Sequence, residues 1–318
     1  MRVLVTGATG FVGRHLCAAL LAAGHQVKAV TRRDHAFNLA AGIQVVNMGN
    51  LGPNKDWRSS LADIDTVIHL AARTHVMRDS ALDPEAEYHR INVGATTALG
   101  VQAAAGGVHR FIFLSSVKAG AEVSLRDIPL QTKMPPNPQD AYGRTKLAAE
   151  KALGELSAES DMDVVVLRPP LIYGPGVKGN FLELFNAVNR GVPLPLRWVD
   201  NRRDLIYVEN LVAALMRVME VPATICGTHY VCDGDAVSTP ELIRRTADAL
   251  NRPARLLPMP ERALRLAGWM TGRSEVIKRL TESLCIDGHA FRRRAAWSPP
   301  FSMKEGLART AAWYKSQR

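Results

Sequence analysis

Tyr142 and Lys146 are the first candidates for chemistry in this chain, because a spacing of four places a phenol and an ammonium on one face of a helix. Ser115 and Ser116 end a short apolar segment earlier in the chain. The ammonium can lower the pKa of the phenol, which can then exchange a proton with a hydroxyl or a ketone while a serine hydrogen-bonds the same oxygen. The same spacing also occurs in ordinary amphipathic helices, so the surrounding elements decide between the two interpretations.

A glycine-rich segment, GATGFVG at residues 7–13, follows a strand pattern and opens a helical one. Gly7 permits a tight turn, Gly10 lets the backbone approach a pyrophosphate, and Gly13 lets the helix pack on the strand. Phe11 and Val12 begin the helix, whose N–H groups and positive dipole end face the phosphates. The segment predicts a dinucleotide site, although a turn without a ligand can show the same pattern.

The second strand pattern, at residues 26–31, is followed by Arg32 and Arg33. Sites for NAD usually carry an acidic residue there, which accepts hydrogen bonds from the adenosine ribose. Two arginines can instead bind a 2′-phosphate by charge-assisted hydrogen bonds. The sequence therefore favours NADP(H), with NAD(H) as the alternative, and leaves open that both arginines lie in solvent.

The elements around these residues alternate between apolar strands and helices. We predict strands at residues 2–6, 26–31, 43–47, 66–70, 110–115 and 163–168, and helices at 11–23, 84–105, 141–156 and 239–250. This alternation predicts an α/β protein with a doubly wound parallel (Rossmann) sheet. We expect a dinucleotide-binding domain at 1–169, with a return segment at about 204–235. The remaining segments, 170–203 and 236–318, are expected to form a smaller, mainly C-terminal substrate domain.

Seven segments of the chain carry a family resemblance: GATGFVG at 7–13, DTVIHLAA at 65–72, INVGAT at 91–96, FIFLSS at 111–116, YGRTK at 142–146, RPPLIYGPG at 168–176 and VENL at 208–211. Together they resemble the extended short-chain dehydrogenase/reductases of the NAD-dependent epimerase/dehydratase type, which act on nucleotide sugars. The resemblance implies that Ser116 is the catalytic hydroxyl, supported by Ser115, and that Asn92 stabilises the active-site backbone. The further cofactor contacts that it implies are Ala71 and Ala72 at the pyrophosphate, Asn50 and Leu51 at the adenine, and Pro169.

The resemblance also implies residues for a UDP- or dTDP-sugar. Asn180 and Phe181 match the place where the family binds the nucleotide diphosphate, and Arg203 matches an arginine that contacts it. Arg279 is a candidate for a second such arginine. Lys118 is a candidate for binding a sugar hydroxyl, an N-acetyl carbonyl or the diphosphate. The expected hydride and proton transfers need no metal.

Members of this family reduce, epimerise or dehydrate their substrates. Related dehydratases carry two acid–base residues directly after the catalytic hydroxyl, where this chain has Val117 and Lys118, so we do not expect dehydration. The 4-epimerases usually have an acidic residue after the second strand, which is missing here. We therefore favour a 4-ketoreductase that forms UDP-N-acetylquinovosamine for surface polysaccharide, with a 4-epimerase as the alternative. A redox-sensing regulator that binds NADP is the non-enzyme alternative, but such proteins typically lose the Tyr–Lys pair.

Composition limits the partners. The 318 residues carry a net charge of +10, and residues 252–318 hold 14 lysines and arginines against 5 aspartates and glutamates. A basic region without aromatic interleaving or a recognition motif suits a nucleotide ligand better than nucleic acid. Four scattered cysteines with no CxxC pair predict reduced thiols and no zinc.

No apolar run reaches the length of a membrane span and no signal-peptide pattern opens the chain, so we expect a cytoplasmic protein. A homodimer is compatible with the resemblance. The segment 262–280, which contains Trp269 and Met270, predicts either a helix packed beside the sugar site or a docking surface for a membrane or a protein complex.

Overall fold

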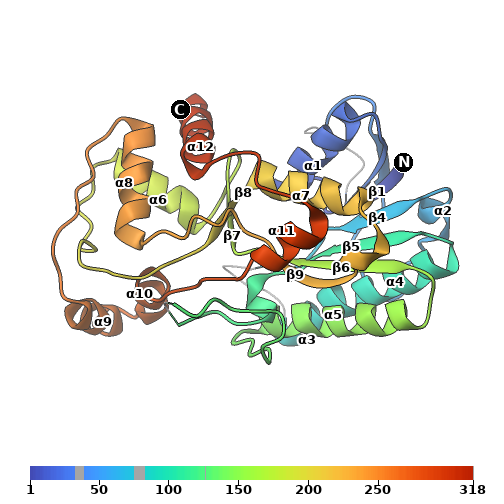
Figure 1. The fold of residues 1–318 in the computed structure, drawn as a ribbon, viewed down its shortest axis with the longest axis horizontal. Coiled ribbons are helices and arrows are strands. Elements are labelled where there is room, and N and C mark those ends of the chain that lie inside the picture. Colours follow the sequence, from blue (N-terminus) through green and yellow to red (C-terminus); the bar gives the residue numbers. More distant parts are fainter. Residues whose placement is uncertain (33–38, 75–82, 126, 318) are drawn as a thin grey trace.

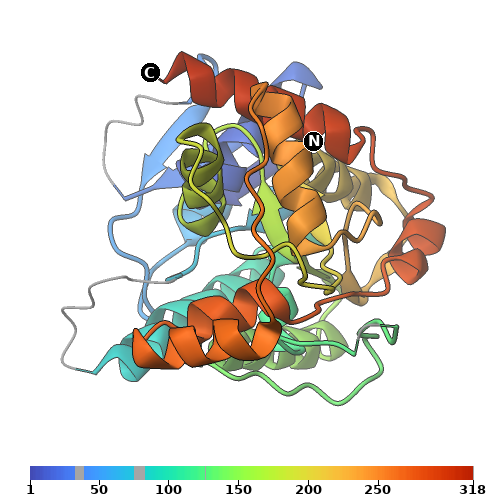
Figure 2. The same ribbon diagram turned by 90° about the vertical axis from the view of Figure 1, so that its left-hand side faces the viewer.

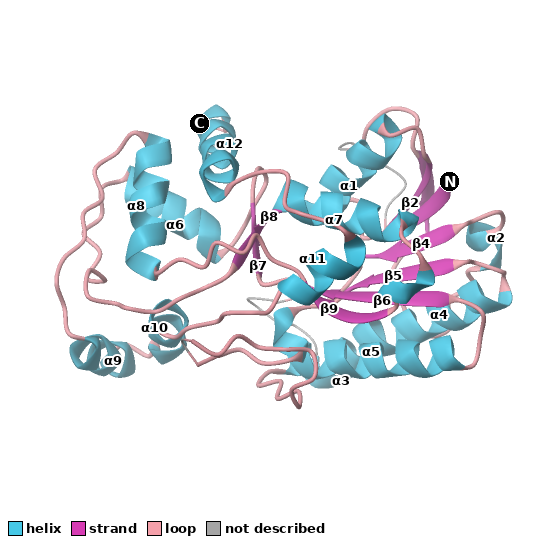
Figure 3. Ribbon diagram, viewed as in Figure 1, coloured by secondary structure: helices cyan, strands magenta, loops and turns pink. Residues whose placement is uncertain are grey.

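Seven parallel strands form the central sheet, in the order β3-β2-β1-β4-β5-β6-β9. The computed structural model in Figure 1 describes residues 1–32, 39–74, 83–125 and 127–317. The strands of the sheet are β1 (Arg2–Thr6), β2 (Gln26–Thr31), β3 (Gln44–Asn47), β4 (Thr66–His69), β5 (Arg110–Leu114), β6 (Asp163–Arg168) and β9 (Gly227–Tyr230). Helices lie on both sides of it (Figure 3), which confirms the predicted doubly wound α/β fold.

Helices α1 and α7 pack together on one face of the sheet, and α4 and α5 pack together on the other (Figure 1). The helices of the described chain are α1 (Phe11–Ala22), α2 (Arg58–Leu61), α3 (Pro84–His89), α4 (Ala95–Ala105), α5 (Ala141–Ala158), α6 (Asn180–Asn189), α7 (Val208–Glu220), α8 (Thr239–Leu250), α9 (Glu261–Met270), α10 (Ser274–Thr281), α11 (His289–Ala295) and α12 (Met303–Ser316). None of the helices in the described ranges is both long and apolar enough to cross a membrane.

Alternation of side chains along the strands creates two cores. In β1, Val3 and Val5 belong to the core beneath α1 and α7, whereas Leu4 belongs to the opposite core with Phe111 and Phe113 of β5. Successive side chains of a strand point to opposite faces, and a parallel sheet covered on both faces needs apolar residues at nearly every position. This requirement explains the apolar runs of the central strands β1, β4, β5 and β6.

The segment 84–105, predicted as one helix, is divided in the structure. A π-helical turn, Arg90–Gly94, joins α3 to α4. This turn directs the buried side chain of Asn92 inward, where its amide donates to the carbonyl oxygen of Arg73 at 3.0 Å and to Oγ1 of Thr145 at 3.1 Å. Single-turn π segments of this kind often accompany functional sites.

Beyond β6, the chain forms a second region at the other end of the molecule, where α6, α8, α9, α10 and α12 gather (Figures 1 and 2). Two short strands, β7 (Leu171–Tyr173) and β8 (Leu205–Tyr207), pair with each other in parallel beside it. The chain then returns through α7 to β9, which pairs with β6. We retain as a proposal the division into a dinucleotide-binding domain and a substrate domain at the boundaries given above.

Candidate active site

A cavity of about 1320 Å³ lies at the carboxyl ends of the parallel strands, where ligands bind in doubly wound sheets. It runs from the glycine-rich segment to α6 and α10. Of the residues singled out from the sequence, those that line it are Gly7, Gly10, Phe11, Val12, Gly13, Arg32, Asn50, Leu51, Ala71, Ala72, Ser115, Ser116, Lys118, Tyr142, Lys146, Pro169, Asn180, Phe181, Arg203 and Arg279. Arg33 lies outside the described residues, and Asn92 supports the backbone behind the cavity.

The glycine-rich segment leaves room for a phosphate group. Gly7 has a φ of +68°, and a Cβ atom on it would lie 2.8 Å from the backbone nitrogen of Ala71. A Cβ atom on Gly13 would overlap the carbonyl oxygen of Gly7, so this helix start tolerates only glycine. Within the described ranges, no side chain caps the N-terminus of α1 after Gly10. Its free N–H groups therefore suit the pyrophosphate of a dinucleotide.

The end of β2 forms the adenosine side of the cavity. Thr31 is buried, and the side chain of Arg32 is exposed at the cavity wall. Asn50 and Leu51 reach the same cavity from the segment after β3. Thr31 and Arg32 are the described residues at the end of β2, and neither carries a carboxylate. They therefore offer no carboxylate acceptor to a ribose hydroxyl.

Tyr142 and Lys146 project from the first turns of α5 toward the end of β5. The ammonium of Lys146 is buried, donates to the carbonyl oxygen of Leu114 at 2.9 Å and lies 6.0 Å from the centre of the Tyr142 ring. Ser116 follows β5 and hydrogen-bonds the phenol of Tyr142. The structure therefore brings together the hydroxyl, the phenol and the ammonium that the sequence predicted to act together.

Burial dominates the electrostatics of this group. It raises the pKa of Tyr142, and the nearby charge of Asp140 raises it further, whereas the hydrogen bond from Ser116 opposes the rise. Burial lowers the pKa of Lys146 to about 7, and the carboxylate of Glu150 opposes that change. A proton-exchanging phenol beside a lysine with such a pKa is typical of an active site.

Glu150 is a supporting residue that the sequence analysis missed. It forms a buried ion pair with Arg168 of β6, with an Nη2–Oε2 distance of 2.5 Å, and it accepts a hydrogen bond from Ser115. The pair thereby ties α5 to the ends of β5 and β6. A signal was present, because Glu150 follows Lys146 by four residues and so lies on the same inward helix face.

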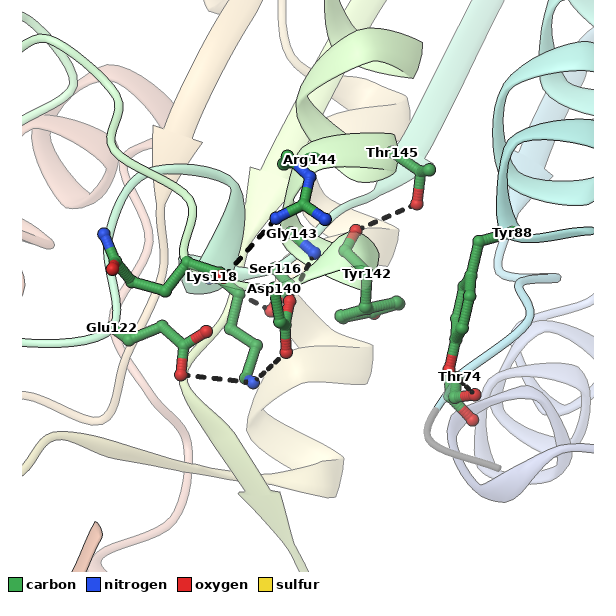
Figure 4. A network of polar contacts seen from close by, with 11 residues as sticks. Thr74, Tyr88, Ser116, Lys118, Glu122, Asp140, Tyr142, Gly143, Arg144 and Thr145 are labelled. Carbon is green, nitrogen blue, oxygen red and sulfur yellow. Dashed lines mark hydrogen bonds and ion pairs between the residues drawn. The ribbon is translucent and has the colours of Figure 1, made fainter. Parts of the chain in front are cut away.

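Lys118, expected from the sequence to bind the substrate, forms ion pairs with two carboxylates of the protein. Its ammonium lies 2.5 Å from Oδ2 of Asp140 and 3.3 Å from Oε2 of Glu122 (Figure 4). Asp140 also caps α5 by accepting from the backbone N–H of Gly143 at 2.7 Å. Lys118 lines the cavity as expected, but two carboxylates already bind its charge, which weakens the expected role as a direct substrate contact. The cap Asp140 was also missed, although aspartate is a common helix N-cap.

The far end of the cavity is lined by two arginines and the start of α6. Arg203 is partly buried and donates to the carbonyl oxygens of Arg279 and Glu282, each at 3.0 Å. The exposed side chain of Arg279 lines the cavity from α10. Asn180 is exposed at the N-terminus of α6, whereas Phe181 is buried and stacks on Tyr173. Glu183, Glu275 and Glu282 line the same end of the cavity. The two arginines and the helix N-terminus are therefore the features of this end that suit an anionic ligand.

The doubly wound sheet, the glycine-rich helix start and the Tyr142–Lys146 pair beside Ser116 are the features of an extended short-chain dehydrogenase/reductase. More narrowly, the chain belongs to the NAD dependent epimerase/dehydratase family, whose sequence profile matches residues 3–232.

Several known proteins are similar over nearly their whole length. A UDP-glucose 4-epimerase of Vibrio cholerae is 38 % identical over 311 residues, which cover 97 % of this chain and 94 % of the relative. A ceramide reductase of Caulobacter vibrioides is 28 % identical over 332 residues, covering 99 % and 94 %. The structure of MoeE5 in complex with UDP-glucose and NAD is 28 % identical, with a TM-score of 0.79 and coverage of 100 % and 99 %.

Proposed function

We propose that this protein is a UDP-sugar 4-epimerase that uses a nicotinamide cofactor. The observation that carries the proposal is the 38 % identity, over nearly the whole chain, to a UDP-glucose 4-epimerase. The sequence motifs favoured a 4-ketoreductase, with a 4-epimerase as the alternative. The similarity to a known 4-epimerase supports the alternative better than the 4-ketoreductase. The missing acidic residue after β2 is therefore a weaker guide to the reaction than the similarity of the whole chain.

The side chains around Tyr142 suit acid–base chemistry at C4 of the sugar. In this proposal, Tyr142 takes the proton from the C4 hydroxyl and later returns it, while Ser116 hydrogen-bonds the same oxygen. Lys146 holds the ribose next to the nicotinamide, and the glycine-rich segment holds the pyrophosphate. A nicotinamide bound there would supply the hydride acceptor and donor. Asn180, Arg203 and Arg279 line the far end and are proposed to bind the diphosphate.

A 4-ketoreductase is the second candidate, and Arg32 is the observation that favours it. The guanidinium lines the cavity at the end of β2, where a 2′-phosphate would lie. A reductase must exchange its cofactor at each turnover, whereas an epimerase regenerates NAD in place. A preference for NADP(H) would therefore favour reduction.

Replacing Arg32 by alanine tests this cofactor preference. If Arg32 binds the 2′-phosphate, we expect Arg32→Ala to weaken NADPH binding roughly 10- to 150-fold, because a charge-assisted hydrogen bond is lost. NADH binding should change little, and calorimetry with both cofactors measures the difference. Equal affinity of the wild-type protein for NADH and NADPH would contradict the NADP preference predicted from the sequence.

Replacing Lys118 by methionine tests its link to Tyr142. The negative charge of Asp140 raises the pKa of Tyr142, and the ammonium of Lys118 partly neutralises that charge. Without the ammonium, the pKa of Tyr142 should rise further, so less of the phenol is deprotonated at a given pH. We expect the acidic limb of the kcat/KM profile to move to higher pH by roughly 0.5–1 unit.

Lys133→Met is the matched control for Lys118→Met, because Lys133 is an exposed lysine on the same connection between β5 and α5. A raised KM for the sugar without a shift of the pH profile would instead support the direct substrate contact predicted from the sequence. Unchanged constants and an unchanged profile would remove Lys118 from the site.

The decisive experiment for the reaction incubates the protein and NAD with UDP-glucose or UDP-N-acetylglucosamine and follows the sugar protons by NMR. An epimerase converts either sugar to its C4 epimer without net consumption of NAD, and Tyr142→Phe should not. A parallel assay supplies NADPH with a UDP-4-keto-6-deoxy sugar. Consumption of NADPH in that assay, with no epimer formed in the first, would replace the epimerase by the reductase.

A further inference from the structure

Helix α9 exposes apolar side chains that the fold does not use. Leu266, Trp269 and Met270 are 57 %, 75 % and 73 % exposed. Trp269 and Met270 follow Leu266 by three and four residues, the spacings that place side chains on one helix face. The inner face of the same helix is a separate one, formed by buried Leu264 and Gly268. Folding therefore explains the inner face of α9 but not the outer one.

Packing of α9 against α10 holds this outer face in place. A Cβ atom on Gly268 would lie 2.7 Å from Cγ1 of Ile277, so the two helices approach closely. Ile277 packs in turn against the main core. The pair lies at the outer end of the molecule, away from the seven-stranded sheet (Figures 1 and 2). The two interpretations of segment 262–280 apply to different helices. Val276 and Arg279 of α10 line the cavity, whereas the three exposed apolar residues of α9 do not.

Positive charge borders the exposed apolar residues. Arg262 lies one helical turn before Leu266, and Arg273 lies in the turn between α9 and α10, three residues after the end of α9. Both arginines are exposed, and within the described part of the chain neither forms an ion pair. Between residues 261 and 279, five lysines and arginines stand against two glutamates. The partner that complements this surface is apolar at its centre and anionic around it.

We propose that the outer face of α9 (Arg262, Leu266, Trp269 and Met270), together with Arg273 in the turn that follows, docks on the surface of an anionic lipid bilayer. Tryptophan and leucine on one helix face, flanked by arginines, are the composition of helices that lie in the headgroup region. A second copy of the chain fits less well. A ten-residue helix is about 15 Å long and about 10 Å wide, a footprint of about 150 Å², whereas a stable dimer buries about 800 Å² per subunit.

Vesicle flotation of the full-length protein tests this proposal. Vesicles of equal parts phosphatidylcholine and phosphatidylglycerol should carry the wild-type protein upward, and vesicles of phosphatidylcholine alone should carry much less. Trp269→Ser with Met270→Ser should weaken partitioning at least about tenfold, because two exposed apolar side chains that the bilayer would cover are lost. Arg262→Glu with Arg273→Glu should weaken it at least about fivefold, and added salt should weaken wild-type binding.

Two controls separate oriented docking from general attraction of a basic protein. Arg293→Glu with Arg294→Glu makes the same charge change on exposed residues of α11, and Val45→Ser removes an exposed apolar side chain from β3. Both should bind vesicles nearly as well as the wild type. Equal losses in the α11 and α9 charge variants would overturn the proposal.

Two further outcomes would also overturn it. One is absence of wild-type binding to the anionic vesicles. The other is a wild-type dimer that the Trp269→Ser, Met270→Ser variant converts to a monomer, because α9 would then contact a second copy. The α9 variants leave the cavity intact, so unchanged NAD binding shows that they are folded. This test does not depend on which sugar the protein uses.

Discussion

Tyr142→Phe should lower turnover by about 10²- to 10⁴-fold, the usual contribution of a general acid–base group. Phenylalanine keeps the ring beside Lys146 and removes only the oxygen that exchanges the proton. Cofactor binding should therefore persist, which calorimetry with NAD measures separately from the turnover followed by NMR. Near wild-type turnover in this variant would remove Tyr142 from the mechanism.

Tyr88→Phe is the matched control. Tyr88 lies close enough to Tyr142 to contribute to the rise of the pKa of Tyr142, but its own hydroxyl donates to the carbonyl oxygen of Thr74 at 2.8 Å. Removing this hydroxyl should leave turnover within a few-fold of the wild type. A comparable loss in both variants would mean that any lost tyrosine hydroxyl disturbs this region, and the effect at Tyr142 could not then be assigned to proton exchange.

Glu150→Ala should be the most destabilising substitution at the site, by about 3–5 kcal/mol in the free energy of unfolding. The guanidinium of Arg168 is buried and depends on Glu150 for its charged partner, with Nε and Nη2 both donating to the carboxylate. Alanine leaves that charge uncompensated and also removes the acceptor of Ser115. Urea denaturation measures the loss.

The double variant Glu150→Met, Arg168→Met identifies the cause of that loss. Replacing a buried ion pair by apolar side chains of similar volume is often nearly neutral, because both desolvation costs disappear together. We expect the double variant to recover most of the stability that Glu150→Ala loses. If it is as unstable as Glu150→Ala, packing at this position accounts for the loss, and the unpaired guanidinium does not.

The sequence by itself determined the features that depend on neighbours along the chain. The strands up to β6 follow from apolar runs, and their predicted positions agree with the structure to within a residue or so. The glycine-rich segment and the Tyr142–Lys146 spacing were also readable, because each lies within one turn or one helix. Local spacing fixes the geometry of such groups before any tertiary contact forms.

Only the tertiary structure decided which charged side chains far apart in the sequence form ion pairs. Asp140 at the start of α5 binds the ammonium of Lys118, and Arg168 of β6 forms an ion pair with Glu150 of α5. These contacts join residues far apart in the sequence, so no periodicity within a single helix or strand encodes them. The exposed side of α9 is a similar case, since the sequence of segment 262–280 left open whether its apolar residues are packed or form a docking surface. Its packing against α10 determines which apolar residues are buried and which remain at the surface.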